Sequence, residues 1–272
     1  MIYTIITKSV IGVAYFSVSS TISAVIGNAG LISQALYPKL LAKGSHDYIT
    51  ENFSRLMYFA IPLLGIAVIF SKPALFALNP AYEGVSIVVI IYSFRTFFYV
   101  ITATLYQILM GIETVDVEKN YNYQTLRKSK LFLIPTLQNI QYGLYLVTLA
   151  FVLFIESNKM SQIELVTWWT VIALTIQIPF LIYAIILVQK QIKFSLSYFR
   201  ITKYVAATIV FVIVFSFTSN MIIDYQISIY NFLPKVIFEL FICLSIYLSI
   251  TLAVDKGTRN FFKSIIGELT SK

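Results

Sequence analysis

The chain has 272 residues, of which 58% are hydrophobic and 12% are charged, and its formal net charge at pH 7 is +8. An average soluble domain carries roughly 25% charged residues, so a water-soluble fold of this length could not hide so much apolar surface. Apolar runs of about 20 residues recur along the whole chain, as expected where bilayer thickness sets the length of each element. We therefore expect an all-α, multi-pass transmembrane helical bundle.

Seven apolar runs predict seven transmembrane spans in chain order. Their approximate bounds are 10–37, 56–78, 84–110, 131–155, 163–189, 204–223 and 234–254. The longest loop between them, residues 112–130, leaves no room for a soluble domain. We therefore expect one transmembrane helical domain over residues 1–254 and a cytoplasmic tail over residues 255–272.

The basic residues alternate from loop to loop. Four of the 20 Lys and Arg residues lie on one side of the predicted spans, Arg95 lies within a span, and fifteen lie on the other side. The fifteen are Lys39, Lys43, Arg55, Lys119, Arg127, Lys128, Lys130, Lys190, Lys193, Arg200, Lys203, Lys256, Arg259, Lys263 and Lys272. Under the positive-inside rule these fifteen residues face the cytoplasm. The rule therefore places Met1 on the outer side of the cytoplasmic membrane and the C-terminus in the cytoplasm. The net charge thus orients the chain, and we expect no nucleic-acid partner.

Small residues follow a regular spacing in the first span. Ser19, Ser23 and Gly27 are four residues apart, and the same spacing one position later ends at Asn28. Small residues at this spacing let two helices approach closely within a membrane. The pattern favours helix packing, with Asn28 as a further candidate for substrate contact.

The third span carries a charge near its middle. Tyr92, Arg95, Tyr99, Thr102 and Tyr106 follow steps of three and four residues, which places them on one stripe of a helix. A charge at that depth costs from about 2.5 to over 10 kcal/mol depending on the reference state, so it normally faces a protein interior or a wet cavity. We expect this stripe to line a cavity; the alternative is that Arg95 pairs with a neighbouring helix only to hold the bundle together.

The fourth span holds a second polar cluster, around Gln138, Gln141 and Tyr142. Amides in hydrocarbon need hydrogen-bond partners, which either a neighbouring helix or a wet path can provide. Both interpretations stay open, and these three residues join the third-span stripe as candidate substrate contacts. The fifth span adds Gln177 and Pro179, and a proline within a span can kink its helix.

Acidic residues are almost absent from the spans; Glu239, near the outer end of the seventh, is the one clear case. Cys243 is the only cysteine, so neither a disulfide nor a cysteine metal site is expected. Nothing in the chain matches a phosphate loop, a zinc-binding HExxH motif, a haem motif or a nucleophile with a paired base. We therefore expect neither an enzyme nor a bound cofactor or metal.

A basic segment, residues 190–203, joins the fifth and sixth spans. It alternates Lys190, Lys193 and Arg200 with apolar residues such as Ile192 and Phe199. Such a segment either lies on the membrane surface, where anionic head groups attract bases, or is a plain basic loop.

Four short segments occur in a characteristic order. They are Leu-Tyr-Pro-Lys-Leu at 36–40, Ile-Pro-Leu at 61–63, Asn-Pro-Ala-Tyr-Glu at 79–83 and Gln-Ile-Leu-Met-Gly at 107–111. This order resembles the polysaccharide flippases of the multidrug/oligosaccharidyl-lipid/polysaccharide exporter superfamily, in which similar segments open the second half of the protein. The resemblance is best over residues 12–154.

The resemblance implies a fold of two helical lobes, with twelve to fourteen spans together, around a cavity that opens alternately to either face. Seven spans match the later lobe of a fourteen-span version, so the first lobe is missing: the chain is truncated or split, or it pairs with another chain. The implied substrate is a polyprenyl-linked oligosaccharide, carried from the cytoplasmic to the outer leaflet. The expected partners are thus membrane lipid, a lipid-linked saccharide and a separate or missing N-terminal lobe.

The residues agree with this substrate in one respect. A diphosphate is anionic, and Arg95 offers a delocalised cation with a fork of donors, while tyrosines and amides suit sugar hydroxyls. The alternatives are a cation or drug exporter of the same superfamily, which should place carboxylates in the cavity, and a non-transporting membrane scaffold subunit.

Overall fold

The computed structural model describes residues 2–35, 40, 46–113, 127, 129–192, 197–226 and 228–270. Within these ranges all regular elements are helices and no strand occurs. Seven of the described helical segments are long and apolar enough to cross a membrane. The expected all-α, multi-pass fold class is therefore confirmed.

Parts of several sequence predictions lie outside the described residues, among them residues 193–196 of the basic segment at 190–203. Another is the segment at 36–40, of which the structure describes Leu40 alone. A third is the set of cytoplasmic bases, of which Lys39, Lys43, Lys119, Lys128, Lys193 and Lys272 fall in the undescribed ranges. The orientation of the termini stays a prediction from the charge asymmetry.

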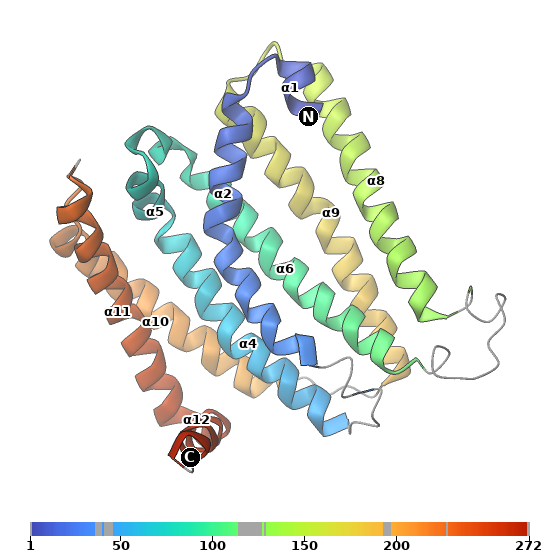
Figure 1. Cartoon of the computed structure of the whole chain (residues 1–272), viewed down its shortest axis with the longest axis vertical. Helices are drawn as coiled ribbons and strands as arrows, with labels where there is room; N and C mark the ends of the chain where they lie inside the picture. Colours follow the sequence, from blue (N-terminus) through green and yellow to red (C-terminus); the bar gives the residue numbers. More distant parts are fainter. Residues whose placement is uncertain are drawn as a thin grey trace. The chain divides into compact units, whose positions relative to one another are not determined.

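The chain forms two compact units, an N-terminal unit (Met1–Leu196) and a C-terminal unit (Ser197–Lys272). The N-terminal unit contains α1 (Ile2–Thr7), α2 (Ile11–Gly27), η1 (Asn28–Ala35), α4 (His46–Ile69), α5 (Ser71–Leu78), η2 (Pro80–Val85), α6 (Ser86–Gly111), α8 (Lys130–Glu156) and α9 (Gln162–Gln191). Its central helix is α6, which packs most extensively against α9 and α2 and also contacts α4 and α8 (Figure 1). Among the described α-helices, α2, α4, α5, α8 and α9 all contact α6.

The second predicted span is corrected by the structure. The sequence placed it at residues 56–78, but α4 begins at His46 and ends at Ile69, and a separate helix, α5, follows after Phe70. Pro73 explains the break: it has no N–H to bond the carbonyl four residues earlier, and its ring clashes with that carbonyl. The first turn of a new helix tolerates proline, which is where Pro73 lies in α5. An ion pair of 2.7 Å between Lys72 and Glu83 then joins α5 to η2.

The first span changes its helical geometry part-way. It is α-helical up to Gly27 and continues as the 3-10 helix η1 from Asn28 to Ala35. Runs of 3-10 helix longer than three or four residues are uncommon, and within a span they often mark a hinge or a strained stretch. The change comes where α2 reaches the stretch that lines a cavity described below.

A short helix that the sequence did not predict, α1, precedes the first span. Tyr3 anchors it: the side chain is 1% exposed, and its hydroxyl donates a hydrogen bond of 2.6 Å to Gln162 Oε1 at the start of α9. Burial raises the pKa of Tyr3 to about 12. Gly12 passes so close that a Cβ atom there would lie 2.0 Å from Tyr3 Oη, so a larger residue would displace the ring.

The C-terminal unit is a helical hairpin with a third helix at its end. It contains α10 (Tyr198–Ile222), α11 (Ile229–Val254) and α12 (Lys256–Thr270), and α10 packs along α11 through contacts such as Phe211 against Tyr247. Both long helices begin earlier than the predicted spans at 204 and 234. Glu239 therefore lies deeper than predicted, ten residues (239 − 229) or roughly 15 Å along α11.

Candidate functional site

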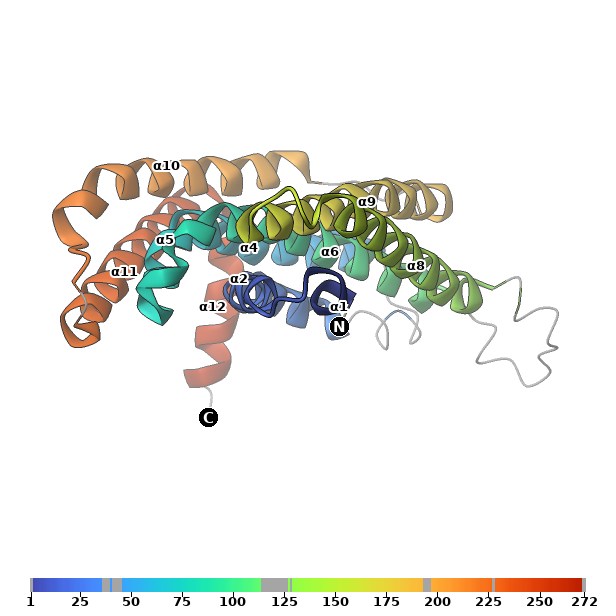
Figure 2. The same cartoon turned by 90° about the horizontal axis from the view of Figure 1, so that it is seen from above.

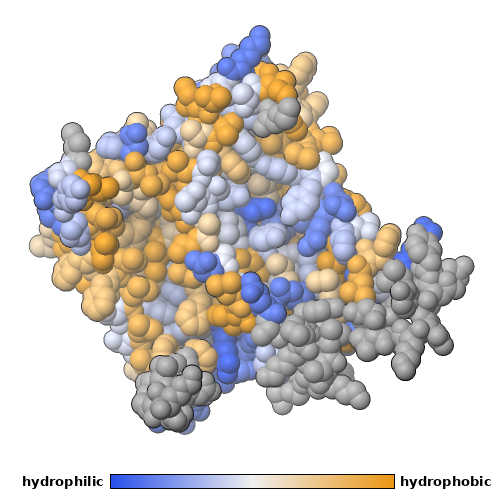
Figure 3. Space-filling view, in the orientation of Figure 1, coloured by the Kyte–Doolittle hydropathy of each residue, from blue (hydrophilic) through white to orange (hydrophobic). Residues whose placement is uncertain are grey.

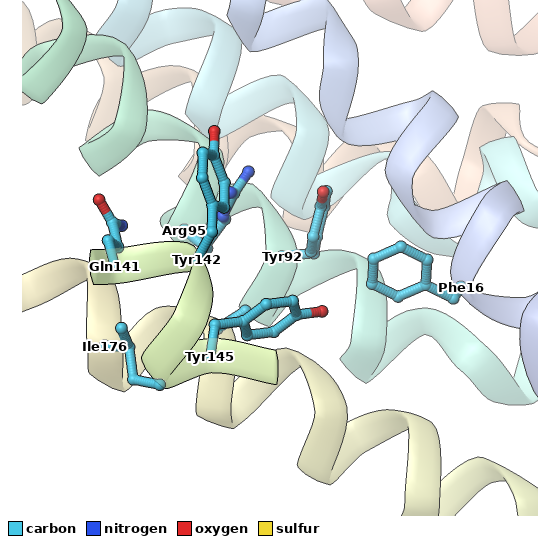
Figure 4. Close-up of a pocket in the computed structure, with 8 residues that line it drawn as sticks. Phe16, Tyr92, Arg95, Gln141, Tyr142, Tyr145 and Ile176 are labelled. Carbon is cyan, nitrogen blue, oxygen red and sulfur yellow. The ribbon is translucent and has the colours of Figure 1, made fainter. Parts of the chain in front are cut away.

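Arg95 projects from α6 into a cavity of about 150 Å³ within the N-terminal unit. Helices α2, α6, α8 and α9 all contribute to its wall, and α9 supplies only aliphatic side chains to it. The polar and aromatic lining residues are Phe16, Tyr92, Arg95, Gln141, Tyr142 and Tyr145, which Figure 4 shows around a common space. On the molecular surface, hydrophilic and intermediate side chains gather between α2 and α8 (Figure 3).

Arg95 contacts aromatic rings and, in the described part of the chain, has no acidic partner. Its Cζ atom lies 5.4 Å from the ring centroid of Tyr92 and 5.1 Å from that of Tyr99, within the range of cation–π attraction. Among the described residues no carboxylate forms an ion pair with it. The alternative of a structural ion pair thus finds no support in the described part of the chain, and the guanidinium N–H groups are available to a ligand.

A second cavity of about 370 Å³ adjoins the first, because Tyr92 and Arg95 line both. Its remaining wall comes from α2, η1 and α6, and includes Ser20, Ser33, Gln34, Tyr99 and Gln107. One of these groups lacks a partner: Gln107 Oε1 is buried and accepts no hydrogen bond from the described residues. Arg95 therefore lies at the wall shared by the first and the second cavity, and neutral polar groups line both.

A chain of hydrogen bonds joins three helices beside the first cavity. Gln141 Nε2 on α8 donates to Gln177 Oε1 on α9 at 2.7 Å, and Gln177 Nε2 donates to Thr102 Oγ1 on α6 at 3.0 Å. Thr102 in turn donates to the carbonyl oxygen of Phe98 at 2.8 Å. Both interpretations of the fourth-span amides therefore hold for Gln141, which bonds another helix and also lines the cavity.

Stacked aromatic rings form the wall on the α2 side. The rings of Phe16 and Trp169 are parallel with centroids 4.0 Å apart, and Phe16 meets Tyr92 edge to face at 5.2 Å. The indole N–H of Trp169 donates a hydrogen bond to the hydroxyl oxygen of Tyr145. These contacts tie α2, α6, α8 and α9 together, so the cavity wall is held by packing rather than by loops.

The structure places the nine candidate residues in three groups. Tyr92, Arg95, Gln141 and Tyr142 line the first cavity, and Tyr99 lines the second. Thr102 and Tyr106 are each 2% exposed and lie inside the helix packing instead of at either cavity. Gln138 is half-buried and Asn28 is exposed, and neither lines these two cavities.

The small-residue face of the first span serves two roles. Ser19 and Ser23 are fully buried, and Ser23 Oγ lies 2.9 Å from Ser93 Oγ on α6, which is the close helix packing that the spacing favours. One position further on, Ser20 lines the second cavity.

Sequence reasoning missed Phe16 and Trp169 as parts of the site. The tryptophan pair 168–169 within a span was the available signal for Trp169.

The arrangement offers polar and aromatic groups that could contact a bound molecule. One cation, several phenols and several amides surround connected space, and the described residues hold no group of His, Cys, Asp and Glu side chains able to hold a metal ion. Comparison of the chain with protein-family models, with curated proteins and with solved structures gives no match.

Proposed function

We propose that this chain is a component of a membrane transporter that flips a polyprenyl-linked oligosaccharide or polysaccharide precursor across the cytoplasmic membrane. The observation that carries the proposal is Arg95, which lines two adjoining cavities and has no ion-pair partner among the described residues. A guanidinium offers a rigid fork of donors that matches the oxygens of a diphosphate. In this proposal Arg95 holds the anionic head group of the lipid carrier.

The neutral groups around Arg95 support a saccharide beside the diphosphate. Aromatic faces such as Tyr92 and Tyr142 offer flat apolar surface, while Gln141, Gln34 and Gln107 offer amide donors and acceptors. Among the residues that the structure describes, no carboxylate lines either cavity, which favours an anionic cargo over the organic cation that a drug exporter would carry. The sequence resemblance implies a second helical lobe as the partner. Alternating access would then come from rigid-body movement of the two lobes relative to each other.

Binding of the lipid carrier by the purified chain is the direct test. The chain is reconstituted in lipid nanodiscs and titrated with a polyprenyl diphosphate and with the uncharged polyprenol of the same length. We expect Arg95→Ala to weaken diphosphate binding about 10- to 100-fold, because a hydrogen bond to a charged group contributes roughly 1.5–3 kcal/mol. Arg95→Lys should recover part of the loss, since a point charge replaces the fork. Polyprenol binding should stay unchanged.

Lys159→Ala is the matched control, because it removes an exposed cation from the same unit. In cells that carry the complete transporter, Arg95→Ala should abolish saccharide export while leaving the amount of protein in the membrane nearly normal. Normal diphosphate binding by a well-expressed Arg95→Ala chain would overturn the proposal.

A further inference from the structure

Helix α12 starts at the end of a membrane span. Only Asp255 separates it from α11, which is long and apolar enough to cross a bilayer and ends at Val254. In Figures 1 and 2, α12 runs across the end of α11 and does not continue its direction. A helix that leaves the end of a span sideways has the direction that an interfacial helix needs to lie in the plane of a membrane surface.

Hydrogen bonds fix the turn between the two helices. Asp255 is 3% exposed, and its Oδ2 atom accepts hydrogen bonds from the Thr258 amide at 2.9 Å, the Thr258 hydroxyl at 2.7 Å and the Tyr204 hydroxyl at 3.1 Å. The bond from the Thr258 amide is the contact by which an N-capping residue stabilises the first turn of a helix. Lys203 Nζ donates to the carbonyl oxygen of Val254 at 3.1 Å, so α10 also holds the end of α11.

A close contact adds a further restraint on the first turn of α12. A Cβ atom on Gly257 would lie 3.0 Å from Cζ of Arg200, so the guanidinium on α10 packs directly against this glycine. The direction in which α12 leaves the hairpin is therefore set by α10 as well as by the cap.

The two sides of α12 differ in chemistry. Thr258 is buried and points toward the ends of the spans, and Phe262, four residues later, falls on the same side of the helix. In the sequence, Ile265 and Leu269 continue this spacing in steps of three and four. Lys256, Arg259 and Lys263 are exposed and lie on the flank and the opposite side.

We propose that α12 is a surface-bound helix that docks onto anionic lipid head groups at the end of α11 where it begins. Its apolar side faces the bilayer because it is the side that Thr258 turns toward the spans, and its bases lie among the head groups. The charge of the segment favours anionic lipid as the partner, because residues 256–270 contain three bases and a single acid, Glu268. Bases close to an anionic leaflet and an apolar face together are what holds an amphipathic helix in the interface.

Spin labels on opposite sides of α12 test this in the full chain. Cys243, the only cysteine, is buried in α11 and is first replaced by alanine. Single cysteines then replace Phe262 on the apolar side or Asn260, which is exposed on the other side. The labelled chains are reconstituted into vesicles of phosphatidylcholine alone or mixed with phosphatidylglycerol, and electron paramagnetic resonance measures access of oxygen and of a water-soluble nickel chelate.

With phosphatidylglycerol present, we expect the label at position 262 to be open to oxygen and shielded from the nickel chelate, and the label at position 260 to show the reverse. Without it, the shielding at position 262 should fall. Neutralising Arg259 and Lys263 to glutamine should weaken the surface-bound state about fivefold per base at low salt. Neutralising Lys159 and Lys235 instead changes the net charge equally and should leave the shielding intact.

Two results would overturn the proposal. Equal nickel access at positions 260 and 262 in both kinds of vesicle would place α12 in water, as expected if it docks a soluble protein instead. Equal shielding of position 262 with and without phosphatidylglycerol would show that anionic lipid is not its partner. If the Phe262→Cys chain does not fold, a label at Phe261, which lies next to it and is half-buried, gives the same reading.

Discussion

The two units place a charged side chain inside a span in opposite ways. In the N-terminal unit, Arg95 is half-buried, stands at the wall of two cavities and has no acidic partner in the described part of the chain. In the C-terminal unit, Glu239 is fully buried between α11 and α10, where the Thr218 hydroxyl donates to its Oε1 atom. A charge at a cavity wall can meet a ligand, whereas a fully enclosed carboxyl can only serve the contact between its two helices. The difference teaches that burial, and not charge alone, separates a binding candidate from a packing contact.

Each unit holds buried polar atoms without a partner among the described residues. Gln107 Oε1 is such an atom in the N-terminal unit, and Glu239 Oε2 is one in the C-terminal unit. An unsatisfied buried oxygen is costly, and more so on a carboxyl group, which can carry a charge. The hydrogen bond from the Thr218 hydroxyl to Oε1 is therefore the polar contact that matters most for Glu239.

Natural probes allow the units to be followed separately. The only two tryptophans, Trp168 and Trp169, lie on α9 of the N-terminal unit, and the only cysteine, Cys243, is fully buried in α11 of the C-terminal unit. Tryptophan fluorescence therefore reports unfolding of the first unit, and reaction of the thiol with a fluorescent maleimide reports opening of the second. The predictions for Thr218, Gln177 and Arg95 below use these two signals in detergent solution, and those for Asp255 use hydrogen exchange.

The largest effect should come from Thr218→Val in the C-terminal unit. This change removes the donor to Glu239 and leaves both carboxyl oxygens without a partner, at a cost of about 3 kcal/mol in the free energy of unfolding. We expect thiol labelling of Cys243 to begin at a clearly lower temperature. The control is Thr208→Val on the same helix, since the Thr208 hydroxyl is buried but lacks a partner among the described residues. Equal shifts for the two variants would contradict a special role of the Glu239 contact.

A smaller effect is expected from Gln177→Leu in the N-terminal unit. It breaks the bonds to Gln141 and Thr102 at once, which should cost about 1–3 kcal/mol in the free energy of unfolding, seen by tryptophan fluorescence. Gln138→Leu is the matched control, because Gln138 is a half-buried amide on α8 outside this network. If the control destabilises the unit as much, the hydrogen-bonded chain is not what stabilises the packing of α6, α8 and α9.

Asp255 sharpens the contrast with Glu239, because this buried acid receives several donors. Burial acts to raise the pKa of Asp255, but hydrogen bonds from Thr258 and Tyr204 and the nearby Arg200 outweigh it and lower the pKa below its ordinary value. The stabilisation is therefore present above the ordinary carboxyl pKa of about 3.9 and is lost as the pH falls through the lower folded value. Protection of the Thr258 amide against hydrogen exchange, measured relative to an unstructured amide at the same pH, should fall over that acidic range.

The Asp255→Ala variant should accelerate exchange of the Thr258 amide already at neutral pH, with a cost of about 1 kcal/mol, as for the loss of a helix cap. Asp224→Ala, which removes an exposed acid at the other end of the hairpin, serves as the control and should leave this amide unchanged. Unaltered exchange in the Asp255→Ala variant would mean that the cap does not hold the start of α12.

The sequence was sufficient to predict the number of spans, because bilayer thickness imposes a length that composition reveals directly. It did not predict the break at Phe70, since the apolar run continues through residues 56–78 and only Pro73 interrupts the hydrogen bonding. Helix α12 was taken as a plain tail, although Phe262, Ile265 and Leu269 already carry a helical spacing. Length and hydropathy thus determine the spans, while breaks and surface helices depend on single residues and on periodicity in short segments.

The candidate site was predictable only near Arg95. The helical spacing keeps Tyr106 close to the direction of Arg95 and Tyr99, so its burial does not follow from the stripe itself. Neighbouring helices cover the part of α6 that holds Thr102 and Tyr106, which places both residues in the packing instead of at a cavity. A partner that decides this, Gln177 on α9, is distant in the sequence and could not be assigned without the fold.

The smallest effect on stability is expected from Arg95→Gln. This variant tests most directly whether Arg95 is a cavity residue or, like Glu239, part of the helix packing. No carboxylate in the described part of the chain would lose its partner, and the cost is limited to the contacts with Tyr92 and Tyr99, together about 1 kcal/mol or less. Removing the charge also relieves the cost of holding a cation at this depth, which acts in the opposite direction. Tryptophan fluorescence should therefore show an unfolding temperature close to that of the unaltered chain and well above that of Gln177→Leu. A loss as large as that of Gln177→Leu would make Arg95 a packing residue like Glu239 and would remove the reason to assign it to a ligand.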